Sequence, residues 1–187
     1  MEELSAITAI QEGDESALLE LMSRYRDPVY RLAFRYVGNP VDAKMLTEEI
    51  FAKVYFSAGR FKPTGTVRSW IFAIAANRCR DFLRREKWSR RMASLRGQSG
   101  IEEGPEGPDA LCDEGRDAAE NAMERERLEE IETAIRALPE RLRFPFVFCV
   151  LEDGSQEEAA LIVGTSRKTI ESRIYRARKV LQAALRA

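Results

Sequence analysis

Apolar residues recur every three or four positions along most of the chain, which is the spacing of one face of an α-helix. The first such stripe is formed by Leu18, Met22, Tyr25, Val29, Leu32 and Tyr36. Gly38 is expected to end this helix, because glycine readily adopts the left-handed conformation found at helix C-termini. Asn39 and Pro40 then predict the cap and the first turn of a second helix.

Glycine and proline punctuate the rest of the chain. Gly59, Pro63 and Gly65 predict a loop, after which a long helix is expected over about residues 67–91. Residues 97–116 contain five glycines, two prolines and many acids, a composition that predicts a flexible, self-repelling linker. Further helices are expected over about residues 117–137 and 140–151, with a break at Leu138-Pro139 and a kink at Pro145.

The C-terminal end of the chain carries the clearest local motif. Ser155 and Glu158 have the spacing of a capping box, which opens a short helix that Gly164 closes. Ser166 caps the next helix, whose apolar stripe is expected to consist of Ile170, Ile174, Ala177, Leu181 and Leu185. A short helix, a glycine turn and a longer basic helix are typical of a helix-turn-helix.

These elements predict an all-α fold, since the sequence shows no β-hairpin signal and no internal repeat. We expect two small helical domains, at residues 1–93 and 118–187, joined by a flexible acidic linker over residues 94–117. The second domain would contain the helix-turn-helix.

The net charge is only −1, but basic and acidic residues are concentrated in different segments of the chain. Residues 60–91 hold ten lysines and arginines against two acids, residues 166–187 seven against one, and residues 100–132 thirteen acids against three arginines. Basic blocks on folded elements favour contact with a polyanion such as DNA. Each block taken alone could instead be a solvated helix face, balanced in the case of the last helix by the acidic linker.

The long helix predicted over residues 67–91 has a basic row on one face, formed by Asn77, Arg80, Arg84, Lys87 and Arg91. Trp70, Phe72 and Trp88 lie near this row. Aromatic rings beside a cationic groove suit single-stranded DNA, whose bases can stack or flip out. The alternative is that these rings belong to the core, and we expect at least one of the three to be purely structural.

Composition excludes several other classes. No apolar run approaches the length of a membrane span, and the acidic N-terminus is unlike a signal peptide, so we expect a cytoplasmic protein without membrane insertion. The chain has no histidine, and Cys79, Cys112 and Cys149 are too far apart in sequence to form a common zinc motif. We therefore expect no metal, no cofactor and no catalytic residue, and interpret the cysteines as small core or surface residues.

The order of several short motifs resembles that of an extracytoplasmic-function (ECF) RNA polymerase sigma factor, within group IV of the sigma-70 family. The resemblance covers about residues 16–92 and 118–186. In the first block it rests on Asp42-Ala43, Leu46-Thr47-Glu48-Glu49-Ile50-Phe51, Arg60-Phe61, Ile74-Ala75-Ala76-Asn77 and Asp81-Phe82-Leu83-Arg84-Arg85. In the second it rests on Leu138-Pro139, Phe146, Gly164-Thr165-Ser166, Thr169-Ile170-Glu171-Ser172-Arg173 and Arg176-Ala177-Arg178.

The resemblance implies a function in transcription initiation, with core RNA polymerase (its beta-prime and beta subunits) and promoter DNA as partners and an anti-sigma factor that holds the protein inactive. The implied polymerase-binding residues are Asp42, Glu48, Glu49 and Lys53. The implied minus-ten residues are Phe61, Lys62, Thr66, Arg68, Trp70, Asn77, Arg80, Arg84 and Lys87. The implied minus-thirty-five residues are Arg167, Lys168, Thr169, Glu171, Ser172, Arg173, Arg176 and Lys179.

The chain departs from the family pattern at a few positions. Lys44-Met45 stands where an acidic pair is usual, and Val67 replaces a common aromatic residue. Lys168 and Glu171 stand where glycine and lysine are frequent, which implies an unusual promoter preference.

Two other functions compete with this interpretation. A plain helix-turn-helix regulator would account for residues 138–187 but would leave the first domain and the linker without a purpose. A sigma-like adaptor that sequesters a regulator without binding a promoter predicts a weakened basic row, which the sequence does not show. An enzyme is disfavoured because no nucleophile–base pair and no phosphate-binding loop are apparent.

Overall fold

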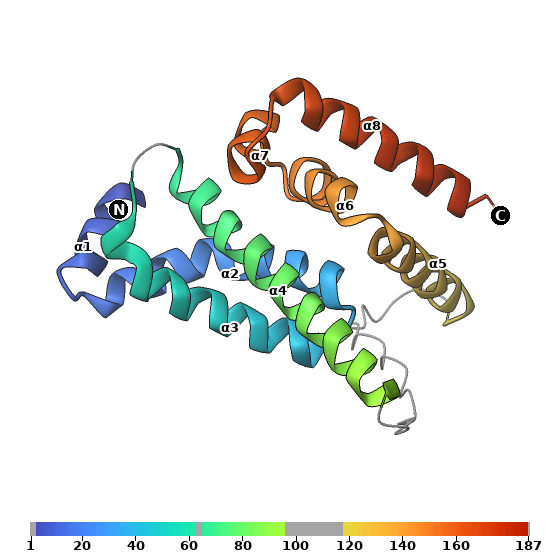
Figure 1. Cartoon of the computed structure of the whole chain (residues 1–187), viewed down its shortest axis with the longest axis horizontal. Helices are drawn as coiled ribbons and strands as arrows, with labels where there is room; N and C mark the ends of the chain where they lie inside the picture. Colours follow the sequence, from blue (N-terminus) through green and yellow to red (C-terminus); the bar gives the residue numbers. More distant parts are fainter. Residues whose placement is uncertain (1–2, 63–64, 96–117, 187) are drawn as a thin grey trace.

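The computed structural model describes residues 3–62, 65–95 and 118–186, and over these residues the fold is all-α (Figure 1). The predicted linker and part of the predicted loop lie outside the described residues. The elements, in chain order, are α1 (Glu3–Gln11), α2 (Glu15–Val37), α3 (Pro40–Ser57), the 3₁₀ turn η1 (Ala58–Arg60), α4 (Val67–Leu95), α5 (Ala118–Ala137), α6 (Glu140–Phe146), the π-helical turn η2 (Val147–Leu151), α7 (Gln156–Val163) and α8 (Arg167–Ala184).

The N-terminal half packs α2 against α1, α3 and α4. The predicted helix ends are confirmed: Gly38 closes α2 with φ of 75°, and the Asn39 side chain accepts hydrogen bonds from the first turn of α3. Helix α1 was not predicted from the sequence. It is held by Ile7 and Ile10, which are buried against the rest of this half.

The C-terminal half contains α5 to α8. The capping box of α7 and the Ser166 cap of α8 are both present, and Gly164 between them adopts φ of 65°. The apolar stripe of α8 is buried as predicted at four positions, but the prediction for Leu185 is wrong, because this residue follows the last turn of the helix and is exposed.

Pro145 changes the helical repeat. Proline has no backbone N–H to donate, and just beyond Pro145 the α-helix α6 gives way to the wider π-helical turn η2. The backbone N–H of Glu152 then bonds to the carbonyl of Val147, five residues back, at 3.0 Å. This turn brings Phe148 and Glu152 to the side of the C-terminal half that faces the N-terminal half.

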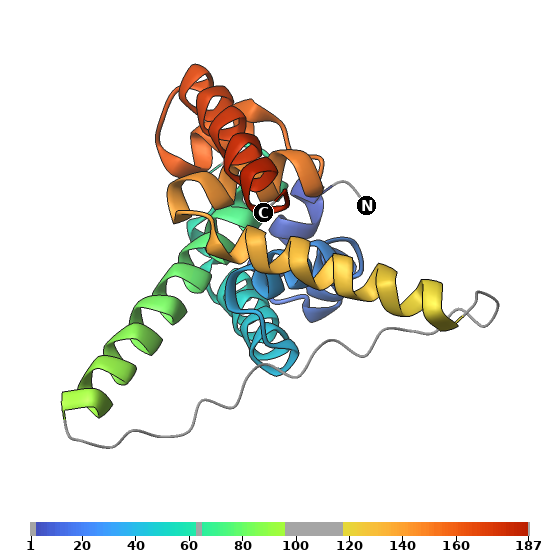
Figure 2. The same ribbon diagram turned by 90° about the vertical axis from the view of Figure 1, so that its right-hand side faces the viewer.

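The two halves pack directly against each other, α7 on α4 and both α5 and η2 on α2 (Figures 1 and 2). Phe72 of α4 and Phe148 of η2 make an edge-to-face contact, with ring centroids 4.9 Å apart, so one hydrophobic core runs through both halves. The C-terminal part of α4 extends beyond this packing into solvent (Figure 2). None of the helices in the described part of the chain is long and apolar enough to cross a lipid bilayer.

Candidate nucleic-acid and protein interfaces

Helix α8 carries the predicted minus-thirty-five residues on its exposed side. Lys168, Thr169, Ser172, Arg173 and Arg176 line one surface hollow together with Arg141 and Leu142 of α6 and the capping Ser166. Four of these residues are cationic and none is acidic, so the hollow suits an anion such as a backbone phosphate. Arg141 was not predicted, because it precedes the helix-turn-helix and joins the hollow only through the packing of α6 against α8.

The remaining predicted residues of α8 lie around this hollow. Arg167 forms an ion pair with Glu157 of α7 at 3.0 Å, and the Lys179 ammonium lies 4.9 Å from the centroid of the Tyr175 ring. Glu171 is exposed, and within the described residues no ion pair links it to Lys168 or Arg178. Its carboxylate therefore faces solvent.

The basic row on α4 is present. The Arg80 guanidinium donates to the Asn77 side-chain oxygen at 2.7 Å, Arg84 pairs with Asp81 at 2.8 Å, and Lys87 is exposed. Of the three aromatic residues near the row, Phe72 is fully buried and is therefore structural, whereas Trp88 is 66% exposed. The expectation that at least one of them belongs to the core is confirmed.

Before the row, the aromatic rings of Phe61 and Trp70 meet edge to face, with centroids 5.1 Å apart. They line a hollow together with Lys62, Gly65, Thr66, Ser69 and Ala73, and Leu161 and Ile162 of α7 complete its wall. A hollow with two aromatic rings and hydroxyl groups has the chemistry to hold a flipped base. In this conformation the C-terminal half forms one side of it.

The predicted polymerase-binding residues lie on α3 and differ in their surroundings. Glu48 and Lys53 are exposed, and Glu48 lines a groove between α2 and α3 with Asp27, Tyr30 and Val41. Asp42 lies in the first turn of α3. Glu49 forms an ion pair with Arg78 of α4, so its carboxylate also connects two helices of the same half.

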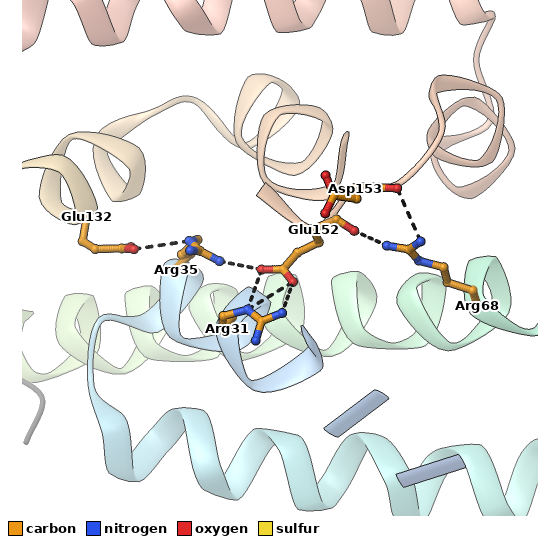
Figure 3. A network of polar contacts seen from close by, with 6 residues as sticks. All are labelled: Arg31, Arg35, Arg68, Glu132, Glu152 and Asp153. Atoms are coloured by element: carbon orange, nitrogen blue, oxygen red, sulfur yellow. Dashed lines mark hydrogen bonds and ion pairs between the residues drawn. The ribbon is translucent and has the colours of Figure 1, made fainter. Parts of the chain in front are cut away.

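A buried carboxylate joins the two halves (Figure 3). The Glu152 side chain is 1% exposed and accepts hydrogen bonds from Arg31 Nε and Nη2 and from Arg35 Nη1, the shortest of them at 2.7 Å. Arg35 also pairs with Glu132 of α5 at 3.3 Å. Neither arginine nor Glu152 was predicted from the sequence, because the partners lie more than 100 residues apart in the chain.

Three predicted minus-ten residues also bind the C-terminal half. Arg68 donates to the backbone carbonyls of Glu152 and Asp153 (Figure 3), and Thr66 Oγ1 donates to the Glu158 carboxylate at 2.6 Å. Arg80 Nε donates to the Glu140 carboxylate at 2.7 Å. Because Arg80 also donates to the Asn77 side chain, a chain of hydrogen bonds runs from Glu140 of α6 through Arg80 to Asn77 in the basic row.

The local pKa shifts follow from these contacts. Burial by itself raises the pKa of Glu158, but hydrogen bonds from Thr66 and Ser155 outweigh this effect and lower it below its usual value. Burial raises the pKa of the Cys79 thiol to about 12 and that of Cys149 to about 11. Both thiols therefore stay protonated and unreactive at neutral pH, and Cys79 is a core residue as expected.

Comparison with known proteins gives a family match for each half. Residues 21–89 match the family model Sigma-70 region 2, and residues 128–181 match the model Sigma-70, region 4. The chain is 31% identical over 176 residues to the ECF RNA polymerase sigma-E factor of Escherichia coli K12, a match that covers 94% of this chain and 90% of that protein.

Two further relatives extend the comparison. The ECF RNA polymerase sigma factor SigE of Mycolicibacterium smegmatis is 32% identical over 173 residues, but the chain spans only 63% of that longer protein. Among solved structures, CnrH in complex with the cytosolic domain of CnrY is similar with a TM-score of 0.68 at 25% identity, covering 96% of this chain and 94% of that one.

Proposed function

The chain belongs to the sigma-70 family of RNA polymerase sigma factors, in its ECF group, and on that premise we propose that it binds core RNA polymerase and directs it to promoters by reading their minus-ten and minus-thirty-five elements. It acts in the cytoplasm as an initiation factor, without a catalytic residue of its own. The observation that carries this proposal is the presence of two separate cationic surfaces, one on α4 and one on α8, in the two segments that match the family models.

The surface on α8 reads the minus-thirty-five duplex. Side chains at the N-terminal end of a recognition helix reach base edges in the major groove, and here these are Arg167, Lys168 and Ser172, followed by Arg173. Arg and Lys recognise guanine through its two acceptors. Arg141 and Arg176, at the edge of the hollow, lie better for phosphates.

The surface on α4 and the preceding loop binds the unpaired minus-ten strand. Phe61 and Trp70 form the aromatic wall of the hollow that receives a flipped base. Asn77 offers an amide for a base edge. Arg80, Arg84 and Lys87 continue along the helix and neutralise the phosphates of the strand.

Helix α3 docks on core polymerase, and a second protein regulates the factor. The exposed Glu48 and Lys53, with Asp42 and Glu49 on the same helix, form the docking surface. For regulation we propose an anti-sigma factor, as the resemblance implies. This partner is supported by CnrH, which was solved in complex with the cytosolic domain of CnrY.

Run-off transcription with purified core polymerase and genomic DNA fragments tests the function. We expect discrete transcripts that depend on this protein, and their loss on Lys168→Ala combined with Arg173→Ala. The variant Arg186→Ala, at the far end of the chain, is the matched control. Transcripts that persist in the double variant would contradict the assignment of α8 and would favour an adaptor that binds no promoter.

A test of polymerase binding needs a variant that leaves the fold intact. Glu48→Lys reverses the charge of an exposed residue, whereas Glu49→Lys also places a cation beside Arg78 and breaks an ion pair between α3 and α4. We expect both variants to weaken binding to core polymerase, measured by co-migration on a sizing column. If Glu48→Lys binds as tightly as the wild type, Glu48 does not contact core polymerase.

A further inference from the structure

We infer that the C-terminal half is an internal inhibitor of the minus-ten surface and that the buried carboxylate of Glu152 holds the two halves in this closed state. This inference rests on the proposed function of α4 and the preceding loop. It concerns the free protein and assigns a regulatory function to Glu152, Arg31 and Arg35, which have no place in either predicted DNA-binding surface.

Glu152 has the geometry of a latch between the halves. Its carboxylate receives hydrogen bonds from Arg31 and Arg35 while its side chain is 1% exposed, so the charge is removed from water and fully paired. A buried carboxylate without partners is strongly unfavourable. Glu152 can therefore be buried only where Arg31 and Arg35 of α2 pair with it. This requirement selects one arrangement of the two halves, the closed state.

The contacts around the latch occupy the groups that a DNA strand would need. Arg68 is bound to two carbonyl oxygens of the loop after η2, Thr66 to the carboxylate of Glu158, and Arg80 to that of Glu140. Carbonyl and carboxylate oxygens accept hydrogen bonds from the same donors that would bind phosphate oxygens and the acceptors of base edges. The C-terminal half therefore occupies three donors of the proposed minus-ten surface, and at these three residues it competes with the strand.

The C-terminal half also restricts the proposed base-binding hollow. Leu161 of α7 forms part of its wall, and a Cβ atom added to Gly65 would lie 2.6 Å from the Leu161 Cδ2 atom. Leu161 therefore lies directly over Gly65 and closes one side of the hollow. Opening of the halves removes the wall and frees Thr66 and Arg68 in one step.

The composition of the interface allows it to open. Apolar contacts between the halves, Phe72 with Phe148 and Leu161 at the hollow of Phe61 and Trp70, are surrounded by ion pairs and hydrogen bonds, several of them between partly exposed side chains. Such pairs contribute little net stability in water and weaken with salt. An interface that combines a shared apolar centre with many polar contacts at its edge can therefore hold the closed state and still yield to core polymerase.

Two variants in opposite halves test the latch. Glu152→Gln keeps the shape of the side chain and removes its charge, and Arg31→Ala removes its partner on α2. One raises the net charge of the protein and the other lowers it, so an effect shared by both cannot come from net charge. Arg26→Ala on the same helix is the control, because Arg26 is exposed and lines a different hollow, beside Asp27 and Glu48.

Small-angle X-ray scattering of the full chain measures opening, and fluorescence anisotropy with a dye-labelled single-stranded 30-mer of mixed sequence measures access to the strand surface. Both variants should increase the radius of gyration and bind the 30-mer about tenfold more tightly, as expected if the closed form makes up about 90% of the free protein. Arg26→Ala should change neither quantity.

The outcomes separate this inference from the proposed function. If neither variant expands the protein, Glu152 is not the latch; if they expand it but bind the 30-mer no better, the C-terminal half is not an inhibitor. Either result overturns the inference. Lys87→Ala in the Glu152→Gln background tests the strand surface alone, because Lys87 has no part in the interface: unchanged binding there would count against the proposed function of α4.

Discussion

On α8 the predicted minus-thirty-five residues face solvent, whereas three of the predicted minus-ten residues on α4 and the loop before it are bound to the other half of the chain. Both surfaces are cationic, and both belong to segments that match a family model. They differ in the form of DNA that each is proposed to read. The proposed surface for duplex DNA is open in the free protein, and part of the proposed surface for an unpaired strand is engaged by the other half.

This difference follows the order of events at a promoter. Duplex DNA is present from the first encounter, but the minus-ten strand becomes available only after melting. A free protein with an open strand-binding surface would bind any single-stranded nucleic acid, since stacking and phosphate contacts discriminate weakly between sequences. Covering that surface until polymerase engages the protein would restrict it to the promoter.

The largest effect is expected from removing the Phe148 ring, which belongs to the core that the two halves share. Phe148 stacks on Phe144 with centroids 5.5 Å apart and meets Phe72 of the other half. Phe148→Ala should lower the free energy of unfolding by about 3–5 kcal/mol, measured by urea denaturation. Leu128→Ala, at a position that is 56% exposed, should change it by less than about 0.5 kcal/mol. Equal effects of the two variants would show that the halves do not share a core.

The second-largest effect should show that the two surfaces bind different forms of DNA. Arg173→Ala should cost roughly 1–3 kcal/mol in binding to a minus-thirty-five duplex, because a bidentate contact to a base edge is lost. The same variant should leave the affinity for single-stranded DNA unchanged. A binding series over single-base variants of the duplex would check both statements, with Arg186→Ala as the control. A loss on both ligands would mean that Arg173 contributes only a general charge.

Asn77 provides the converse test on α4. Asn77→Ala should reduce promoter opening by roughly 0.5–1.5 kcal/mol, the net value of one hydrogen bond, with little effect on binding to closed duplex DNA. Permanganate footprinting of unpaired thymines measures the opening. Ser89→Ala, at an exposed position of the same helix, should open promoters as the wild type does. Normal opening by the Asn77 variant would remove Asn77 from the strand-binding surface.

A smaller change is expected from the one exposed acid among the predicted α8 residues. Glu171→Lys should strengthen binding to every duplex and steepen the dependence of affinity on salt by about one counterion. It should also reduce selectivity at one base pair, because a carboxylate can accept from a cytosine amine and repels phosphates. Titrations at two salt concentrations distinguish this outcome from a purely local change of charge, which would leave selectivity intact.

The smallest effect concerns pH. Because the pKa of Glu158 is lowered in the folded protein, its contribution to stability is present above the unfolded value of 4.5 and is lost as pH falls through the folded value. Glu158→Gln should therefore flatten the decline of stability on acidification by well under 1 kcal/mol, since the carboxylate is only partly buried and solvent screens its contacts. An unaltered pH profile would show that the contact from Thr66 does not stabilise the carboxylate.

The sequence by itself determined the local structure. The caps at Asn39, Ser155 and Ser166 and the glycines at 38 and 164 act within one or two turns of the chain, so their signals can be read directly and the helices begin and end where they predict. The helix-turn-helix and the basic row on α4 followed for the same reason, because helical spacing places their residues on one face.

The tertiary structure decided which helices and side chains contact one another. Nothing near Glu152 in the sequence indicates that it pairs with Arg31 and Arg35, since an isolated glutamate is ordinarily a solvated residue. Its burial depends on the π-helical turn after Pro145, on the packing of that turn against α2, and on two arginines more than 100 positions away in the chain. Such contacts depend on how whole helices pack, which no local pattern records, and for that reason the engagement of Thr66, Arg68 and Arg80 by the other half could be seen only in the folded chain.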